Sequence, residues 1–153
     1  MKYFFLSCCV ILTLTAGAKL YSATGHAGIL GLSDPLLGIS NRSVFCAAGG
    51  LELIAVAFLL LREDNISKCC CILWLALNFT MYRLGIFWLH PGKHCPCLGT
   101  VNEQLEKWGL KPQMTDWLLT MVIVYMLAGS IFFLIREWQH RQFKGILSPN
   151  DLH

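Results

Sequence analysis

The chain has 153 residues, of which 56% are hydrophobic and only 14% are charged, and its mean hydropathy is +0.57. So few charged residues leave too little polar surface to coat a soluble globule of this size, which indicates a membrane protein of about one domain. The net charge of +3 is small and scattered along the chain, which excludes nucleic acid as a partner.

Four apolar segments predict four transmembrane helices. They cover residues 3–20, 44–61, 69–89 and 117–135. Each segment has roughly the 17–25 residues that a helix needs to cross a ~30 Å hydrocarbon core. Trp88 and Trp117 stand where an interfacial aromatic belt is expected. We therefore expect an all-α fold, a four-helix transmembrane bundle over residues 1–135 that has the lipid bilayer as its surroundings, followed by a cytoplasmic tail over residues 136–153.

The first segment has an alternative interpretation as a cleaved signal peptide. Lys2 gives it a short basic start, and Ala16-Gly17-Ala18 has the small residues of a cleavage site. Its length is sufficient for a transmembrane helix, and we favour that interpretation.

Lysine and arginine residues predict the orientation. Six of them flank the spans on the side of the two termini and five lie on the other side. The six sit in short flanks, where the positive-inside bias is strongest. We therefore expect both termini in the cytoplasm and the loop over residues 91–116 on the outer face.

Eight cysteines divide between the two faces. Cys8, Cys9 and the run over residues 69–71 lie on the expected cytoplasmic side, where thiols stay reduced, so we predict small packing residues there. Metal binding or lipid attachment is the alternative for the triple cysteine. Cys46 lies near the outer end of the second span.

The segment "HPGKHCPCLGT" over residues 90–100 carries the sharpest chemical signal. A disulfide between Cys95 and Cys97 would close a ring too small for the preferred ~90° torsion, so it would be strained and easily reduced. Lys93 and a charged His94 would favour the thiolate. This pattern predicts thiol–disulfide exchange by Cys95 and Cys97, with His94 in support and Cys46 as a relay toward a membrane quinone.

Two alternatives remain for this loop. His90, His94, Cys95 and Cys97 together offer ligands for a soft metal, although zinc sites usually space their cysteines by two to four residues. The other alternative is a pair of structural thiols in a tight turn.

A short amphipathic surface helix is expected directly after the two cysteines. Thr100 and Glu103 have the spacing of a capping box, and Gly109 is placed to end the helix. The apolar positions between them repeat at helical spacing, so the helix would lie on the membrane face between the third and fourth spans.

Charged side chains inside the spans predict an interhelical contact. Glu52 lies in the second span and Arg83 in the third, and at about 1.5 Å per residue both are about 9–12 Å below the outer surface. Buried charges in membranes usually pair, so we predict a Glu52–Arg83 pair, with Lys19 at the same end of the first span. The pair would clamp the helices, or else tune the thiols or bind a polar head group below the loop.

Three motifs together resemble the MauE/DoxX-like family of four-helix membrane proteins (methylamine utilisation protein E and relatives). They are "LTAGAKL" at the end of the first span, "GLELIAVAFLL" in the second and "CPCLG" after the third. Carried over position by position, the resemblance identifies Lys19, Glu52, Cys95, Cys97 and Gly99, with Leu98 in place of the family's phenylalanine.

The resemblance implies a redox-associated protein of the bacterial inner membrane that helps a periplasmic thiol protein to mature, as in methylamine metabolism for MauE itself. Helix number and location also resemble the quinone-linked disulfide-generating membrane proteins, but the Cys-x-x-Cys of those proteins is missing here. We expect a thiol–disulfide oxidoreductase, and the alternative is a non-enzymatic membrane scaffold or maturation partner.

Overall fold

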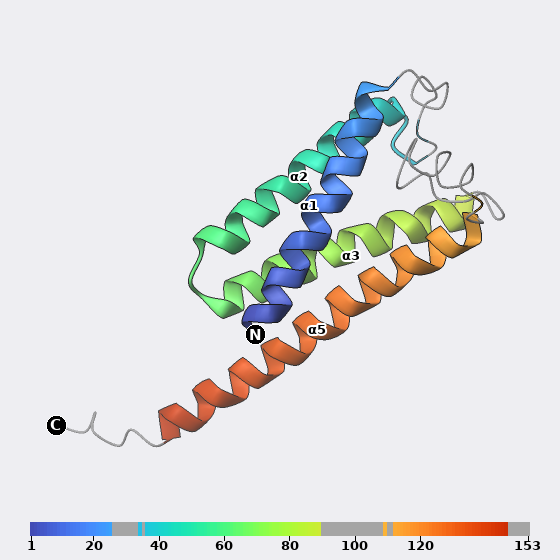
Figure 1. The fold of residues 1–153 in the computed structure, drawn as a ribbon. Coiled ribbons are helices and arrows are strands. Elements are labelled where there is room, and N and C mark those ends of the chain that lie inside the picture. The colour runs from blue at the N-terminus through green and yellow to red at the C-terminus, as the bar shows by residue number, and fades with distance from the viewer. Residues whose placement is uncertain (26–33, 35, 90–108, 110–111, 147–153) are drawn as a thin grey trace.

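The structure is a computed structural model that describes residues 1–25, 34, 36–89, 109 and 112–146. These residues form four helices (Figure 1). The helices are α1 (Lys2–Thr24), α2 (Asn41–Leu61), α3 (Asn65–Leu89) and α5 (Pro112–Ile146). All four contain a stretch that is long and apolar enough to cross a membrane, which confirms the predicted all-α transmembrane fold.

The helices extend beyond the apolar segments from which they were predicted. The difference is largest in α5, which continues to Ile146 where the sequence predicted a tail from residue 136. Membrane thickness limits the apolar stretch and not the helix, and the added turns contain good helix formers such as Arg136 and Glu137. The surface helix expected over residues 100–109 lies outside the described residues, apart from Gly109, whose φ of 85° suits its expected place at a helix end.

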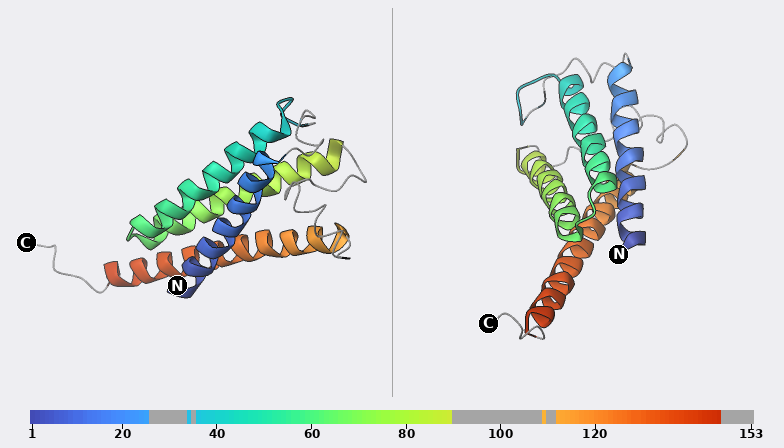
Figure 2. Two further views of the ribbon diagram at one scale, coloured as in Figure 1. Left: turned by 45° about the horizontal axis from the view of Figure 1, so that its top comes forward. Right: turned by 90° about the vertical axis from the view of Figure 1, so that its left-hand side faces the viewer.

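Two helix pairs make up the bundle (Figure 2). Helix α1 packs mainly against α2, and α3 packs mainly against α5, while α2 and α3 make a smaller contact. A short connection over residues 62–64 joins α2 to α3, and Asp64 caps α3 by accepting from the backbone N–H of Ser67 at 2.9 Å. The two pairs are therefore close at this end and diverge toward the other.

The main apolar core fills the end at which the pairs converge. Its buried members come from all four helices: Phe4, Phe5, Cys8, Cys9, Leu12, Ala55, Leu59, Cys69, Ile72, Leu75, Ala76 and Met126. The thiols of Cys8, Cys9 and Cys69 pack here as small apolar groups, as the sequence predicted, while Cys70 is exposed.

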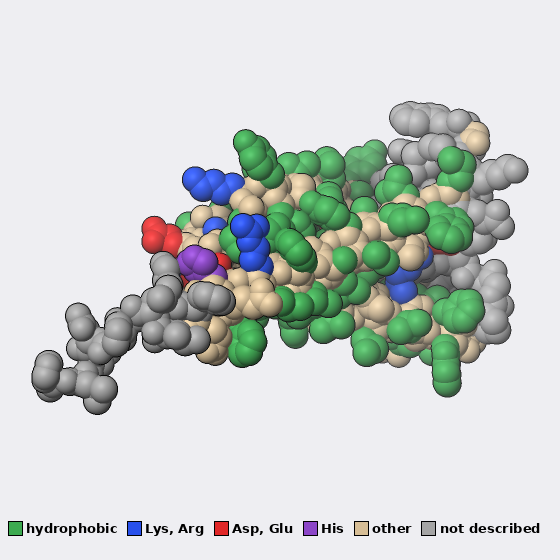
Figure 3. Space-filling model, turned by 90° about the horizontal axis from the view of Figure 1, so that it is seen from below, with side chains coloured by type: hydrophobic (Ala, Val, Ile, Leu, Met, Phe, Trp, Pro, Cys, Tyr) green, Lys and Arg blue, Asp and Glu red, His purple; other side chains and the backbone are tan. Residues whose placement is uncertain are grey.

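Apolar side chains also cover the outside of the bundle. In Figure 3 they extend along most of its length, and charged side chains gather toward the end from which the C-terminal segment leaves. A smaller cationic group shows near the opposite end. An extended apolar surface of this kind is what the hydrocarbon core of a bilayer requires.

Candidate functional site

A cavity of about 430 Å³ occupies the end at which the two helix pairs diverge. Its walls come from all four helices and from the residues just before α2, and they are mostly apolar. The polar side chains that line it are Thr15, Lys19, Glu52, Asn78, Tyr82 and Arg83. A volume in the range of ~300–1,000 Å³, apolar walls and a few polar groups are typical of small-molecule sites.

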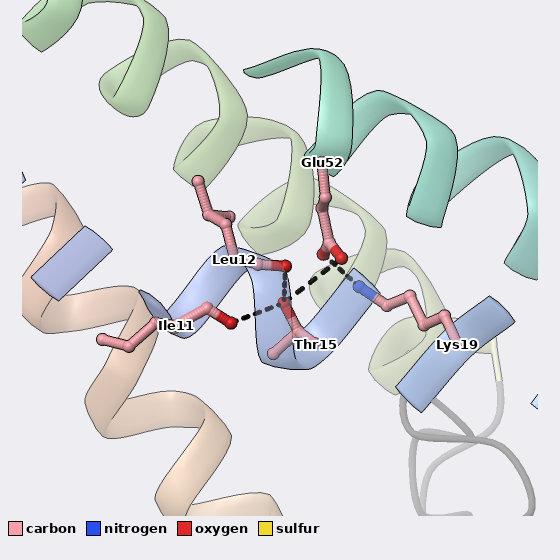
Figure 4. Close-up of polar contacts among 5 residues, drawn as sticks. All are labelled: Ile11, Leu12, Thr15, Lys19 and Glu52. Atoms are coloured by element: carbon pink, nitrogen blue, oxygen red, sulfur yellow. Dashed lines mark hydrogen bonds and ion pairs between the residues drawn. The ribbon is translucent and has the colours of Figure 1, made fainter. Parts of the chain in front are cut away.

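Lys19 of α1 and Glu52 of α2 form an ion pair at this cavity (Figure 4). The Lys19 ammonium donates to Glu52 Oε1, and the two residues are only 8% and 1% exposed. The same ammonium lies 4.7 Å from the centre of the Phe79 ring on α3, where a cation is attracted to the aromatic face. Pairing with each other lets both charges stay inside the bundle.

A close approach of α1 and α2 brings the two charges within reach. At Gly49 of α2, an added Cβ would lie 3.0 Å from Leu20 Cγ and 3.3 Å from the carbonyl oxygen of Ala16. Small residues at this crossing therefore set the separation of the two helices, as they commonly do in membranes.

Thr15 is the third member of this cluster. Its Oγ1 lies 3.2 Å from Glu52 Oε2 and 3.1 Å from the carbonyl oxygens of both Ile11 and Leu12 (Figure 4). A hydroxyl has one proton, so Thr15 can donate to only one of these acceptors at a time. The second oxygen of Glu52 therefore shares its donor with the helix backbone.

The predicted Glu52–Arg83 pair is wrong, although both residues line the same cavity. The helical rise per residue gave both side chains a similar depth below the outer surface, but it could not give the direction in which each side chain points from its helix. Helix α3 packs mainly on α5, so Arg83 reaches Asp116 there, while α1 supplies Lys19 to Glu52. Asn78, which also lines the cavity, donates to the Trp74 carbonyl of its own helix.

Arg83 is only partly satisfied by its partner. Its Nη2 donates to the Asp116 carbonyl at 3.3 Å and lies 3.6 Å from Asp116 Oδ1. Its Nη1 is buried and has no hydrogen-bond partner among the described residues. Arg83 also borders a second cavity of about 340 Å³ between α3 and α5. A buried donor without an acceptor is costly, so this nitrogen marks a place where a ligand oxygen would be favourable.

Asp34 and Tyr82 form a contact that sequence reasoning missed. Asp34 is 1% exposed and accepts from the Tyr82 hydroxyl on α3 and from the backbone N–H groups of Leu36 and Leu37, both at 2.9 Å. Gly38, with φ 67°, completes the turn. The Asp-Pro-x-x-Gly pattern predicts such a turn, but nothing in the sequence pairs it with Tyr82. The turn closes one side of the cavity, because Leu37 is among the lining residues.

The cysteines expected to be reactive are placed as follows. Cys46 is exposed on α2 as a free thiol, and although its neighbours Phe45 and Ala47 line the cavity, Cys46 is not among the described residues that do so. Its relay role stays a prediction. Cys95, Cys97 and His94 lie outside the described residues. Within the part of the chain that the structure describes, no group of three or more potential ligands is placed to hold a metal ion.

Comparison with known protein families, with curated proteins and with solved structures finds no match to this chain.

Proposed function

We propose that this chain is a MauE-like thiol–disulfide oxidoreductase of the bacterial inner membrane. In this proposal both termini lie in the cytoplasm, and Cys95 and Cys97 exchange with a periplasmic thiol protein on the outer face. Four helices able to span a membrane are the foundation of the proposal.

The observation that carries the proposal is the polar cluster of Lys19 and Glu52 in the cavity. The resemblance singled out these two residues on separate helices, and they meet in a buried ion pair. The cavity they line lies toward the end of the bundle at which α3 ends and α5 begins. The segment that joins these two helices contains Cys95 and Cys97. A membrane cavity near the helix ends that the cysteine-containing segment connects suits a protein that passes electrons between a periplasmic substrate and the bilayer.

The exchange step transfers two electrons. A partner thiolate attacks one sulfur of the Cys95–Cys97 disulfide, which breaks that bond and forms a mixed disulfide. The second partner thiol then attacks the partner's sulfur in the mixed disulfide. The products are an oxidised partner and two thiols on Cys95 and Cys97. The strain of the small ring makes the initial disulfide a good oxidant.

The test is the redox state of the two cysteines in intact cells. A membrane-impermeant maleimide is applied to a Cys46→Ser variant with and without mild reductant, since Cys46 is itself exposed. We expect labelling only after reduction, and no labelling in the matched variant that also carries Cys95→Ser and Cys97→Ser. Labelling without reductant would mean free thiols and contradict the proposal.

A second measurement separates exchange from a scaffold role. Cys95→Ser and Cys97→Ser each leave one thiol that cannot be resolved internally, so one of them should accumulate a mixed disulfide with the partner. Maturation of the partner that continues unchanged in the double serine variant would instead support the scaffold.

A further inference from the structure

We propose that the cavity between the helices binds the head group of an isoprenoid quinone, and that Arg83 donates to one of its carbonyl oxygens. The inference deepens the proposed function and rests on it for the fate of the electrons, but the binding itself needs only the described residues.

The charge balance of the cavity favours a neutral head group. Lys19 is neutralised by Glu52, and Arg83 is paired with Asp116. An anionic phosphate bound here would add an uncompensated charge among apolar walls, which is unfavourable at low dielectric. A cationic head group would face the same penalty. The ligand that fits is polar but uncharged.

The hydrogen-bonding groups favour a ligand that accepts. Tyr82 already donates to Asp34, Lys19 donates to Glu52, and Asn78 donates to its own helix. Arg83 Nη1 is the buried side-chain donor of the lining that lacks an acceptor among the described residues. A quinone carbonyl is a neutral acceptor, so it would satisfy this nitrogen without disturbing either ion pair.

The side chains that line the cavity favour an aromatic head and an apolar tail. Aromatic rings of Phe45 and Phe79 stand in its wall, beside aliphatic side chains such as Leu51 and Ile123. A volume of about 430 Å³ accommodates a small molecule, and an isoprenoid tail would continue between helices whose outer surfaces are apolar.

A quinone at this place closes the electron balance of the exchange. After the partner has been oxidised, Cys95 and Cys97 carry two thiols. Their return to a disulfide releases two electrons and two protons, and these convert the quinone to its quinol. The oxidant is then drawn from the bilayer.

Direct binding of a short-chain quinone tests the inference. The full chain is placed in nanodiscs of saturated phosphatidylcholine, and the dissociation constant of decylubiquinone is measured. Ala48→Phe fills the cavity wall from α2, and Ala57→Phe makes the same change at an exposed position of that helix that is not among the lining residues. We expect at least a tenfold weaker affinity for Ala48→Phe and no change for Ala57→Phe.

A second variant pair keeps the test valid if the enlarged side chain impairs folding. Arg83→Gln removes the free donor and should weaken binding about tenfold, the usual scale for one buried hydrogen bond to a charged group. Arg62→Gln makes the same change at the opposite end of the bundle and should have no effect. Equal affinities across both pairs, absence of saturable binding, or displacement by added phospholipid would each overturn the inference.

The variant with Cys95→Ser and Cys97→Ser separates the two proposals. It should bind decylubiquinone with unchanged affinity although it cannot exchange thiols. Exchange that persists in a protein without saturable quinone binding would overturn this inference alone. Binding that persists in a wild-type protein with no exchange would overturn the proposed function alone.

Discussion

The charged side chains of Glu52 and Lys19 are both buried, and each compensates the charge of the other. A buried pair gains little over an apolar pair of equal size, because desolvation offsets most of the attraction. Removing one partner is much worse, since the remaining charge stays buried without compensation. The contribution of this pair therefore appears only when the partners are changed one at a time.

We expect Lys19→Met to lower the free energy of unfolding by about 3–5 kcal/mol, because it leaves the Glu52 carboxylate unpaired. Combining Lys19→Met with Glu52→Gln should cost clearly less than Lys19→Met alone. The measurement is reversible unfolding in mixed micelles of wild type, both single variants and the double variant. Costs that simply add would contradict a direct interaction.

Sequence reasoning reached the buried charges but not their partners. Hydropathy identified Glu52 and Arg83 inside spans, and helical rise gave them similar depths, so their presence at one cavity was within reach. The partner of each depends on the rotation of its helix, which follows from packing across the bundle. The contact between Asp34 and Tyr82 could not be predicted either, because it joins residues that are far apart in the chain and also depends on how the helices pack.

Helix α1 contacts α5 through the aromatic ring of Phe4, which packs against aromatic side chains of α5. The Phe4 ring lies 5.6 Å from the ring of Tyr125 and 5.1 Å from that of Phe133, centre to centre. The hydroxyls of Ser7 and Tyr125 lie 2.8 Å apart. An added Cβ at Gly129 would lie 2.2 Å from Phe4 Cε2, so the glycine leaves the space that the ring occupies.

We expect Gly129→Ala to destabilise the protein, because displacing the Phe4 ring costs about 1–3 kcal/mol of overpacking. Gly17→Ala is the matched control on an exposed face of α1, where an added Cβ meets nothing within 4 Å. It should instead stabilise by about 0.5–1 kcal/mol through helix propensity. Thermal unfolding in one detergent compares the two variants. Shifts of the melting temperature in the same direction would contradict the packing of the Phe4 ring against Gly129.

Helix α1 contributes buried side chains to the core, as expected for a helix that stays in the protein. Cleavage after Ala18 would remove the buried side chains of Phe4, Cys8 and Leu12 from the core, together with Thr15. We therefore predict that the protein in the membrane retains α1, and an intact mass spectrum of purified protein measures this. A mass that corresponds to a chain starting at Lys19 would support the signal-peptide interpretation.

The helix count could be predicted from the sequence because each apolar segment must cross the same thickness of bilayer. The end of α5 could not be predicted in this way, since the helix continues to Ile146 beyond the apolar stretch that crosses the bilayer. The arrangement into two pairs also escaped prediction, because nearly uniform apolar faces do not indicate which helix each one meets.

At the scale of the whole molecule, the short connection between α2 and α3 ties together two helix pairs that separate toward the far end. The apolar core lies at the end where the two pairs converge, and the cavity with its polar cluster lies at the end where they diverge. A bundle of this form is stabilised at one face of the membrane and can receive a ligand near the other. The function of the cavity therefore depends on which face is which.

Charge predicts the orientation. Arg62 lies in the connection between α2 and α3, Lys68 lies in the first turns of α3, and Arg136 follows the apolar stretch of α5. These basic residues close to the apolar spans should keep this end in the cytoplasm. A fluorescent protein fused after residue 153 should then fluoresce, and alkaline phosphatase fused there should be inactive. Phosphatase fused after Gly109 should be active, because that position lies at the opposite end between α3 and α5. The reverse pattern would place the cavity and both proposed cysteines toward the cytoplasm, where a strained disulfide would not persist.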